Sequence, residues 1–252
     1  MSFHVIIPAR YASSRLPAKP LLDIGGKPML QHVYERALQS GAASVTVATD
    51  DARIEAAVIA FGGEACMTSA LHQSGTERLA EAATRLGLKG EDIVVNLQGD
   101  EPLIPPRLLR QVAVILEGDH GADMSTLCTR IHTAAELFDP HVVKVVMDRL
   151  GNALYFSRAV IPWDRDAFAV TTEELPEKAI HHRHLGLYAY RVGFLEEYVT
   201  KTACDLERME SLEQLRVLWH GGRIHVAEAE EIPGPGVDTA EDLNRVRALL
   251  QA

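Results

Sequence analysis

Short apolar runs alternate with helical segments through the first half of the chain, and this alternation most constrains the fold. The first run, FHVIIPA at residues 3–9, is continuously apolar, as in a strand buried on both faces. Further strands are predicted at 44–49, 64–68 and 93–97, and helices at 28–40, 51–61, 74–86 and 105–116. Such βαβ units predict an α/β fold with a mainly parallel central sheet and helices on both faces.

The second half of the chain is less regular. Strands are predicted at 123–131, 142–148, 152–156, 185–190 and 223–228, with helices at 206–219 and after Thr239. In the 206–219 helix, Leu212, Leu215, Leu218 and Trp219 form one apolar stripe. The stretch 157–182 is rich in Pro, Asp and Glu and predicts an excursion from the sheet. We therefore expect one domain over 1–252, with a subdomain inserted at about 150–190.

Charge and composition exclude several classes of protein. The chain carries 25 basic and 35 acidic residues, a net charge of −10, which argues against a general nucleic-acid binder but allows a small anionic substrate. No apolar stretch approaches the ~20 residues of a membrane span, and the N-terminus lacks a basic leader, so a cytoplasmic protein is expected. Cys66, Cys128 and Cys204 form no C-x-x-C pair, so neither zinc nor redox chemistry is indicated.

Ligands of such sheets bind beyond the carboxyl ends of the strands, which directs attention to the loops at 10–27, 69–76 and 98–104. The first loop holds Arg10, Arg15 and Lys19 and has no acid before Asp23. Three cations on one loop can gather phosphate oxygens, although a solvated basic loop is the alternative. The loop has neither the G-x-x-x-x-G-K-[ST] nor the G-x-G-x-x-G spacing, so no dinucleotide cofactor is indicated.

Two acids are candidates for holding a metal near these phosphates. Asp100 follows the buried strand at 93–97, where a carboxylate could hold Mg²⁺ together with phosphate oxygens, or could merely cap a turn. Its neighbour Glu101 is the weaker candidate. Asp238 lies in PGPGVDT, a stiff loop, and could instead assist Thr239 in starting the last helix.

Three histidines cluster near the predicted strand at 185–190. His182 and His184 would share one face of a strand and His181 would not, which argues against a zinc site. Hydrogen bonding to a polyhydroxy ligand is the better interpretation.

Seven segments together resemble the 3-deoxy-manno-octulosonate cytidylyltransferase (CMP-Kdo synthetase) family. They are IIPARYASSRLPAKPL at 6–21, HQSGTERLAE at 72–81, VNLQGDEPLIP at 95–105, ALYFSRAVIPWDRD at 153–166, RHLGLYAYR at 183–191, ESLEQLRVLWHGGRIHV at 210–226 and PGPGVDTAEDL at 233–243. The basic loop and QGDEP occur more broadly among sugar cytidylyltransferases. SRAVIPWDRD and RHLGLYAYR are typical of the Kdo enzymes.

This resemblance implies a reaction in which the anomeric hydroxyl of Kdo attacks the α-phosphorus of CTP, giving CMP-Kdo and pyrophosphate. It also implies Mg²⁺ dependence, a homodimer, a place in lipopolysaccharide biosynthesis, and a nucleotide-diphospho-sugar transferase-like fold whose inserted region helps dimerisation. Sialic acid or 8-amino-Kdo as the sugar, and a non-catalytic nucleotide-binding protein, remain alternatives.

The resemblance also assigns roles to residues. Arg10 and Lys19 would bind the triphosphate, and Asp100 and Asp238 would hold Mg²⁺; these four form the catalytic set. The nucleotide site would comprise Pro8, Ala9, Arg10, Arg15, Lys19, Ser74, Gly75, Arg78 and Gln98. The sugar site would comprise Gln98, Arg158, His184, Tyr188, Glu213 and Gln214.

Two of these residues have competing interpretations. Arg78 could donate to O2 or N3 of cytosine, or could form an ion pair with Glu77 or Glu81 on its own helix. Glu213 could bind sugar hydroxyls or could lie on a helix surface. Arg158 could pair with the Kdo carboxylate.

Overall fold

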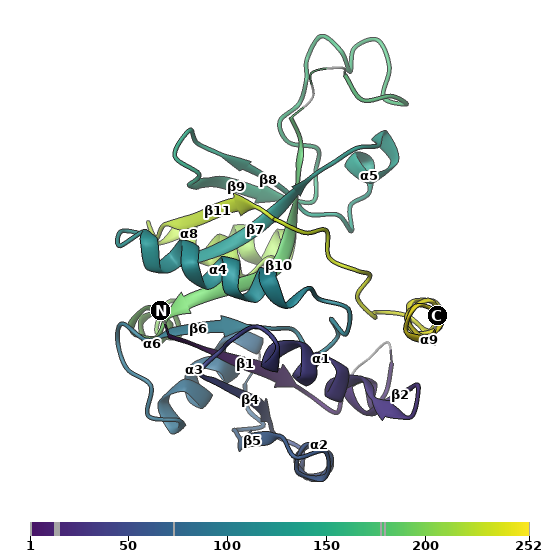
Figure 1. The fold of residues 1–252 in the computed structure, drawn as a ribbon. Coiled ribbons are helices and arrows are strands. Elements are labelled where there is room, and N and C mark those ends of the chain that lie inside the picture. The colour runs from purple at the N-terminus through teal and green to yellow at the C-terminus, as the bar shows by residue number, and fades with distance from the viewer. Residues whose placement is uncertain (1, 13–15, 73, 177, 179, 252) are drawn as a thin grey trace.

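A nine-stranded, mostly parallel sheet organises the computed structural model, which describes residues 2–12, 16–72, 74–176, 178 and 180–251 (Figure 1). Seven strands follow the order β11-β7-β10-β6-β1-β4-β5, and within this path only β10 runs antiparallel to its neighbours. The strands are β1 Phe3–Ala9, β4 Ser44–Thr49, β5 Glu64–Met67, β6 Ile93–Asn96, β7 Met124–Arg130, β8 Lys144–Met147, β9 Ala153–Ser157, β10 His182–Arg191 and β11 Ile224–Glu228.

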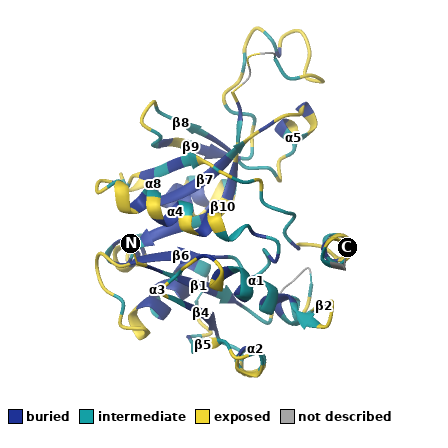
Figure 2. Cartoon of the chain, viewed as in Figure 1, coloured by how far each residue is buried: buried dark blue, intermediate teal, exposed yellow. Residues whose placement is uncertain are grey.

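Helices cover both faces of this sheet, which confirms the predicted α/β class (Figure 2). They are α1 Met29–Leu38, α2 Ala52–Ala60, α3 Gly75–Arg85, α4 Pro106–Gly118, α5 Ala134–Phe138, α6 Val192–Tyr198, α7 Asp205–Glu210, α8 Gln214–Trp219 and α9 Ala240–Gln251. A small hairpin, β2 Asp23–Ile24 and β3 Lys27–Pro28, precedes α1. Among the described residues, no helix is both long and apolar enough to span a bilayer.

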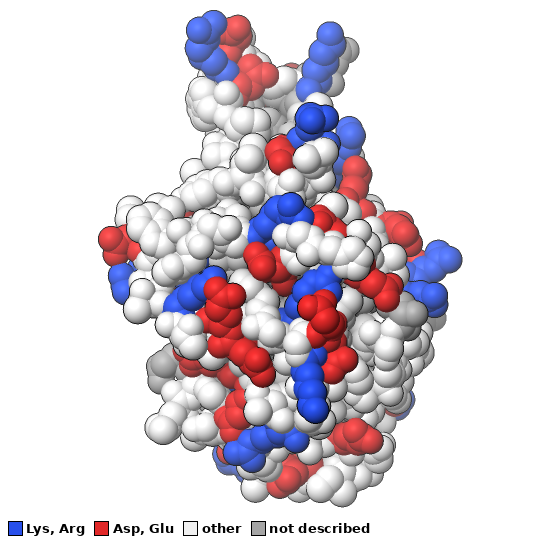
Figure 3. All heavy atoms as spheres, turned by 90° about the vertical axis from the view of Figure 1, so that its left-hand side faces the viewer, with Lys and Arg blue, Asp and Glu red and all other residues white. Residues whose placement is uncertain are grey.

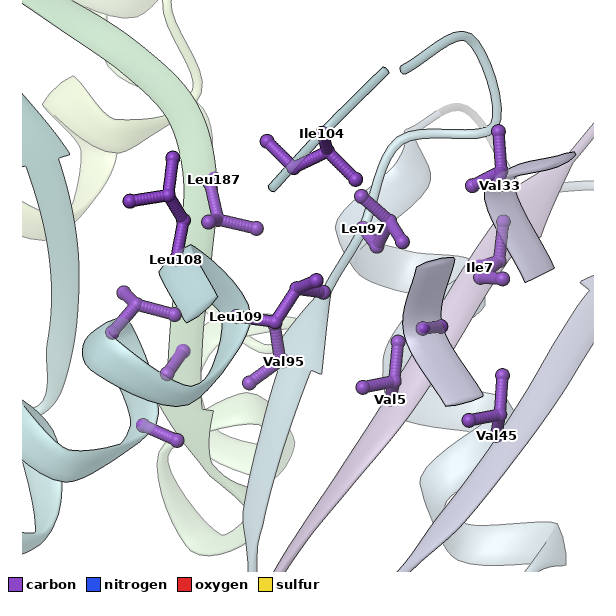
Figure 4. Close-up of a cluster of buried hydrophobic side chains, with 14 of the residues drawn as sticks. Val5, Ile7, Val33, Val45, Val95, Leu97, Ile104, Leu108, Leu109 and Leu187 are labelled. Carbon is purple, nitrogen blue, oxygen red and sulfur yellow. The ribbon is translucent and has the colours of Figure 1, made fainter. Parts of the chain in front are cut away.

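The apolar run at the N-terminus forms the centre of the sheet. Val5 and Ile7 of β1 point toward α1 and α4, where they join Val95 and Leu109 in one core (Figure 4). Ile6 points to the other face, into a second core with side chains of α3, α6 and α8. A strand between two helical layers has no polar face, which explains the uninterrupted apolar sequence.

Strand β10 is longer than predicted and carries the irregularity nearest the site. Its register against β7 shifts between Leu185 and Tyr188. Its first residues pair with both β7 and β8, so the β8–β9 hairpin extends the sheet there. Tyr188 packs against the second core, and His184 lies beside Phe156 of that core.

The segment 158–181, between β9 and β10, projects from the body of the molecule (Figure 1). Its described residues form no helix or strand. Phe168 packs against Trp163 and Phe138, with ring centroids 4.9 and 5.6 Å apart, and His181 Nε2 lies 2.8 Å from the carbonyl oxygen of Pro162. This is the excursion from the sheet that the sequence predicted.

The single helix predicted at 206–219 is wrong: Ser211, with φ 53°, breaks it into α7 and α8. Arg216 of α8 folds back on Glu207 of α7 in a bidentate pair at 2.5 and 2.8 Å. Leu212 is buried as the apolar stripe predicts, but Trp219 is largely exposed. The break sets Glu213 and Gln214 at the start of a new helix.

Acidic and basic side chains are interspersed over the face of the molecule at the amino ends of the parallel strands (Figure 3). Ion pairs such as Arg191–Glu91 and Arg223–Asp119 hold the two signs together. No extended single-sign patch is visible on this face.

Candidate active site

Lys19, Asp100 and Asp238 converge on one point. Lys19 begins a 3-10 helix (Lys19–Leu21) directly after Ala18, whose φ of 56° is left-handed. Its ammonium lies 2.6 Å from Oδ2 of Asp100, in the turn after β6, and 3.0 Å from Oδ1 of Asp238, before α9. The Lys19 side chain is 12% exposed, against 34% and 53% for the two acids. A mid-chain acid and an acid near the C-terminus therefore face one cation from the basic loop.

Backbone contacts place the Asp238 loop beside Asp100. The Val237 amide donates to the Asp100 carbonyl at 2.9 Å. A Cβ on Gly234 would lie only 2.7 Å from Cβ of Leu103, and one on Gly236 would lie 3.0 Å from Oε1 of Glu101. Gly234 therefore permits an approach that a side chain there would block.

The residues present fit a magnesium ion shared with a phosphate ligand. Two carboxylates that reach one ammonium can also reach one divalent ion, and Mg²⁺ prefers one or two carboxylates with phosphate oxygens and waters. No group of three or more His, Cys, Asp or Glu side chains suited to a metal occurs in the described part of the chain. A dedicated all-protein cage is thus not what these donors form.

The basic loop and the loop before α3 are joined by Arg10. Its Nη2 donates to the carbonyls of His72 at 2.5 Å and Ser74 at 3.3 Å. Ser74 caps α3 by accepting from the Glu77 amide at 3.1 Å, which confirms the predicted helix start. The amides of the first turn of α3 thus lie beside Arg10, as donors suited to an anionic ligand.

The remaining predicted nucleotide residues cluster at the same strand ends. Pro8 and Ala9 end β1, and a Cβ on Gly75 would lie 3.9 Å from Cγ of Pro8. Gln98 lies in the turn after β6, where its carbonyl accepts from the Glu101 amide at 3.3 Å. Arg15 falls outside the described residues.

Arg78 is fully buried, and its ion-pair partner is neither Glu77 nor Glu81. Nη2 lies 2.9 Å from Oδ2 of Asp50, after β4, and Nη1 donates to Oγ1 of Thr68 at 2.5 Å. The predicted ion pair with Glu77 or Glu81 is wrong, because Arg78 lies on the face of α3 that packs on the sheet. There the nearest acid is Asp50, directly after β4. Nε of Arg78 is buried without a hydrogen-bond partner. The predicted contact between Arg78 and cytosine is not tested by these contacts and stays a prediction.

Replacing Asp50 with Ala should lower the free energy of unfolding by about 3 kcal/mol, because it leaves a buried guanidinium without its counter-ion. Urea denaturation followed by circular dichroism measures the change. Asp166→Asn is the control, since its pair with Arg165 is almost fully exposed and should contribute under about 1 kcal/mol. Equal losses of unfolding free energy in the two variants would show that the Arg78–Asp50 pair stabilises the fold no more than an exposed ion pair does.

His184 and Tyr188 of β10, two of the predicted sugar-site residues, lie near Phe156 of β9. The ring of His184 lies 5.3 Å from that of Tyr188 and 4.9 Å from that of Phe156. His184 Nε2 lies 3.0 Å from Oγ1 of Thr126. Burial lowers the pKa of His184 to about 3, so its imidazole is neutral and acts through hydrogen bonds.

Arg158 follows β9, and its guanidinium donates to the carbonyls of Glu210 at 2.7 Å and Pro140 at 3.1 Å. The Glu210 carboxylate accepts from the Arg158 amide at 3.0 Å. The end of β9 is thereby tied to α7, close in sequence to the start of α8.

Glu213 and Gln214 stand at the start of α8. Oε2 of Glu213 accepts from Oγ1 of Thr76 at 2.7 Å, across 137 residues of sequence. Gln214 is buried, and its Nε2 has no hydrogen-bond partner. Glu213 is exposed as a whole residue, yet its carboxylate turns inward to the first turn of α3, where burial raises its pKa.

A cavity of about 890 Å³ opens beside the two acids. Of the predicted site residues, its walls include Gln98, Asp100, His184 and Asp238. Arg10, Lys19 and the α3 start are not among its walls, so the cavity adjoins the phosphate-binding candidates rather than enclosing them.

Comparison with known proteins decides the family. The sequence profile of the family described as Cytidylyltransferase matches residues 4–230. The chain belongs to the cytidylyltransferase family. It is 58% identical over 248 residues to a 3-deoxy-manno-octulosonate cytidylyltransferase of Coxiella burnetii, covering 98% of this chain and 99% of that protein. The Vibrio cholerae protein of that name is 58% identical over 250 residues, covering 99% and 98%.

Solved structures place this cytidylyltransferase in the same fold. A CMP:2-keto-3-deoxy-manno-octonic acid synthetase complexed with CTP superposes with a TM-score of 0.91 at 49% identity, covering 100% of this chain and 99% of that one. A cytidylyltransferase from Leptospira borgpetersenii gives a TM-score of 0.63 at 18% identity, covering 100% and 87%, and shares the fold alone.

Sequence reasoning misses one residue of this cytidylyltransferase, Thr76, and ranks another, Glu101, too low. Thr76 belongs to the predicted α3 start, but nothing in its sequence surroundings signals a bond to Glu213. Glu101 ranks below Asp100 on sequence, yet burial, then the charges of Asp100 and Asp238, raise its pKa to about 7. The sequence signal for this raised pKa is the adjacency of the two acids, Asp100 and Glu101, in QGDE.

Glu101→Gln should weaken the pH dependence of stability in metal-free buffer. The folded-state pKa of about 7 exceeds the ordinary 4.5, so the folded protein binds more protons between these values. The wild-type free energy of unfolding should therefore fall as pH rises from 5 to 8, by up to roughly 3 kcal/mol. Denaturant titrations at both pH values should show a clearly smaller fall for the variant. Parallel pH profiles would contradict the burial of an ionisable Glu101.

Proposed function

We propose that this cytidylyltransferase transfers CMP from CTP to the anomeric hydroxyl of Kdo and releases pyrophosphate, in a Mg²⁺-dependent reaction that serves lipopolysaccharide biosynthesis. The observation that carries the proposal is the convergence of Asp100 and Asp238 on the Lys19 ammonium. The full-length likeness to proteins named for this activity supports the choice of Kdo.

Arg10 and Lys19 bind the triphosphate and stabilise the charge that develops as pyrophosphate leaves. Lys19 then exchanges its two carboxylate partners for phosphate oxygens, which keeps its charge compensated throughout. Asp100 and Asp238 are the residues that would hold Mg²⁺. The bound ion would act as a Lewis acid and lower the pKa of the attacking hydroxyl.

Different sets of residues would contact the base and the sugar. Arg78 and the carbonyls of the 72–76 loop suit the donor and acceptor edge of cytosine. Arg158 pairs with the Kdo carboxylate, since an arginine fork matches a carboxylate bidentately. The hydroxyls are bound by polar side chains, most of them on β10 and at the start of α8: Gln98, His184, Tyr188, Glu213 and Gln214.

Pyrophosphate release with CTP and Mg²⁺ tests the proposal when Kdo, 8-amino-Kdo, sialic acid and a plain sugar phosphate are compared. The expected result is the highest kcat/KM with Kdo. Turnover of sialic acid but not Kdo would overturn the choice of sugar. Measurable CTP binding with no pyrophosphate release from any sugar would instead favour a non-catalytic nucleotide-binding protein.

We also propose that the protein is a cytoplasmic homodimer whose contact includes the projecting segment 158–181. Three large apolar side chains on this segment are largely exposed, namely Trp163, Val170 and Ile180, and pairing would cover them. Light scattering should give twice the chain mass of 27.6 kDa, and Val170→Asp should shift it toward the single-chain mass. A wild-type mass of one chain at assay concentration would overturn the dimer.

A further inference from the structure

A chain of contacts links the nucleotide loop to the sugar side through Thr76. Arg10 donates to the Ser74 carbonyl at 3.3 Å, and Thr76 follows two residues later in the first turn of α3. Oγ1 of Thr76 donates to Oε2 of Glu213 at 2.7 Å. Thr76 is buried and β-branched, so its hydroxyl direction is restricted by packing.

The surroundings of Thr76 hold that hydroxyl in place. Burial raises the pKa of the Tyr190 phenol on β10, and Thr76 and Asn96 both lie close enough to it to oppose that rise. Asn96 is buried at the end of β6, so this cluster of polar side chains spans two strands and α3. Close packing of these buried groups restricts the orientation of the Thr76 hydroxyl.

Glu213 receives this hydrogen bond in a setting that suits a hydroxylated ligand. Desolvation by the surrounding protein raises the pKa of its carboxyl group, and the Thr76 bond opposes that rise. A carboxylate has about four acceptor sites, so one bond from Thr76 leaves capacity for ligand hydroxyls. The neighbouring Gln214 has a buried Nε2 without a hydrogen-bond partner, which places a donor next to the Glu213 acceptor.

We propose that Thr76 is a positioning residue that orients Glu213 for the sugar. This inference rests on the proposed function, because it takes Glu213 to contact the sugar.

Thr76→Val, which keeps the shape and removes the hydroxyl, is compared with Thr76→Ser, which keeps the hydroxyl. Thr76→Val should raise KM for Kdo about tenfold and leave KM for CTP within about twofold, since one hydrogen bond to a charged group is lost. Thr76→Ser should restore KM for Kdo to near the wild-type value. Thermal melts establish that both variants fold.

A double variant with Glu213→Gln isolates the pair. If Thr76 acts through Glu213, Thr76→Val should add less than twofold to the effect of Glu213→Gln on KM for Kdo. Equal rises in both KM values, a Ser variant as impaired as the Val variant, or full additivity would each overturn the inference. Wild-type turnover of Kdo is measured first, so failure of the proposed function is seen separately from failure of the Thr76 role.

Discussion

Replacing Asp100 with Asn is expected to lower kcat by about three orders of magnitude, because a neutral amide is a poor ligand for the divalent ion of the proposed reaction. The fold should be retained, since the contact that holds the Asp238 loop uses the Asp100 carbonyl and not its side chain. Steady-state pyrophosphate release with saturating CTP and Kdo measures the loss, and circular dichroism measures the fold.

Glu91→Gln is the control for this experiment. Its carboxylate is almost fully exposed, pairs with Arg191 and should leave kcat unchanged. A kcat for Asp100→Asn within tenfold of wild type would remove Asp100 from the metal site.

Lys19→Met is expected to have two opposite effects. Loss of the cation should lower kcat by about 100- to 1,000-fold, because charge on the leaving pyrophosphate is less stabilised. Mn²⁺ should nevertheless bind more tightly to the nucleotide-free variant. In the wild type the ammonium lies within 3.0 Å of both carboxylates and must be displaced before a divalent ion can approach.

Electron paramagnetic resonance of free Mn²⁺ measures this affinity without turnover. Lys27→Met is the matched control, because its ammonium pairs with Glu35 at 2.8 Å on the nearby hairpin and should change neither kcat nor Mn²⁺ affinity. Weaker Mn²⁺ binding in Lys19→Met than in wild type would contradict competition between the Lys19 ammonium and a divalent ion for Asp100 and Asp238.

Much of the fold follows from local patterns. The uninterrupted apolar run at 3–9 predicts the central strand, and Ser74 with Glu77 three residues on predicts the start of α3. Arg10 and Asp100 can also be chosen as site candidates from sequence alone, because each follows a buried strand and ligands gather beyond strand ends.

The predictions that fail depend on contacts distant in sequence. The leucine stripe through 206–219 continues across Ser211, so periodicity gives no sign of a break there. Arg78 has acids one and three residues away, yet burial against the sheet selects Asp50 instead. Local sequence pattern alone cannot decide whether Asp238 starts the last helix or binds a metal. Its approach to Lys19 depends on glycine contacts with 101–103 that no local pattern reveals.

Anomalous diffraction from crystals grown with CTP and Mn²⁺ would test the shared metal site most directly. The manganese peak should lie at coordination distance, within about 2.5 Å, of a carboxylate oxygen from each of Asp100 and Asp238, with the Lys19 ammonium on a phosphate oxygen. A manganese ion bound to the nucleotide but out of reach of either carboxylate would contradict the account.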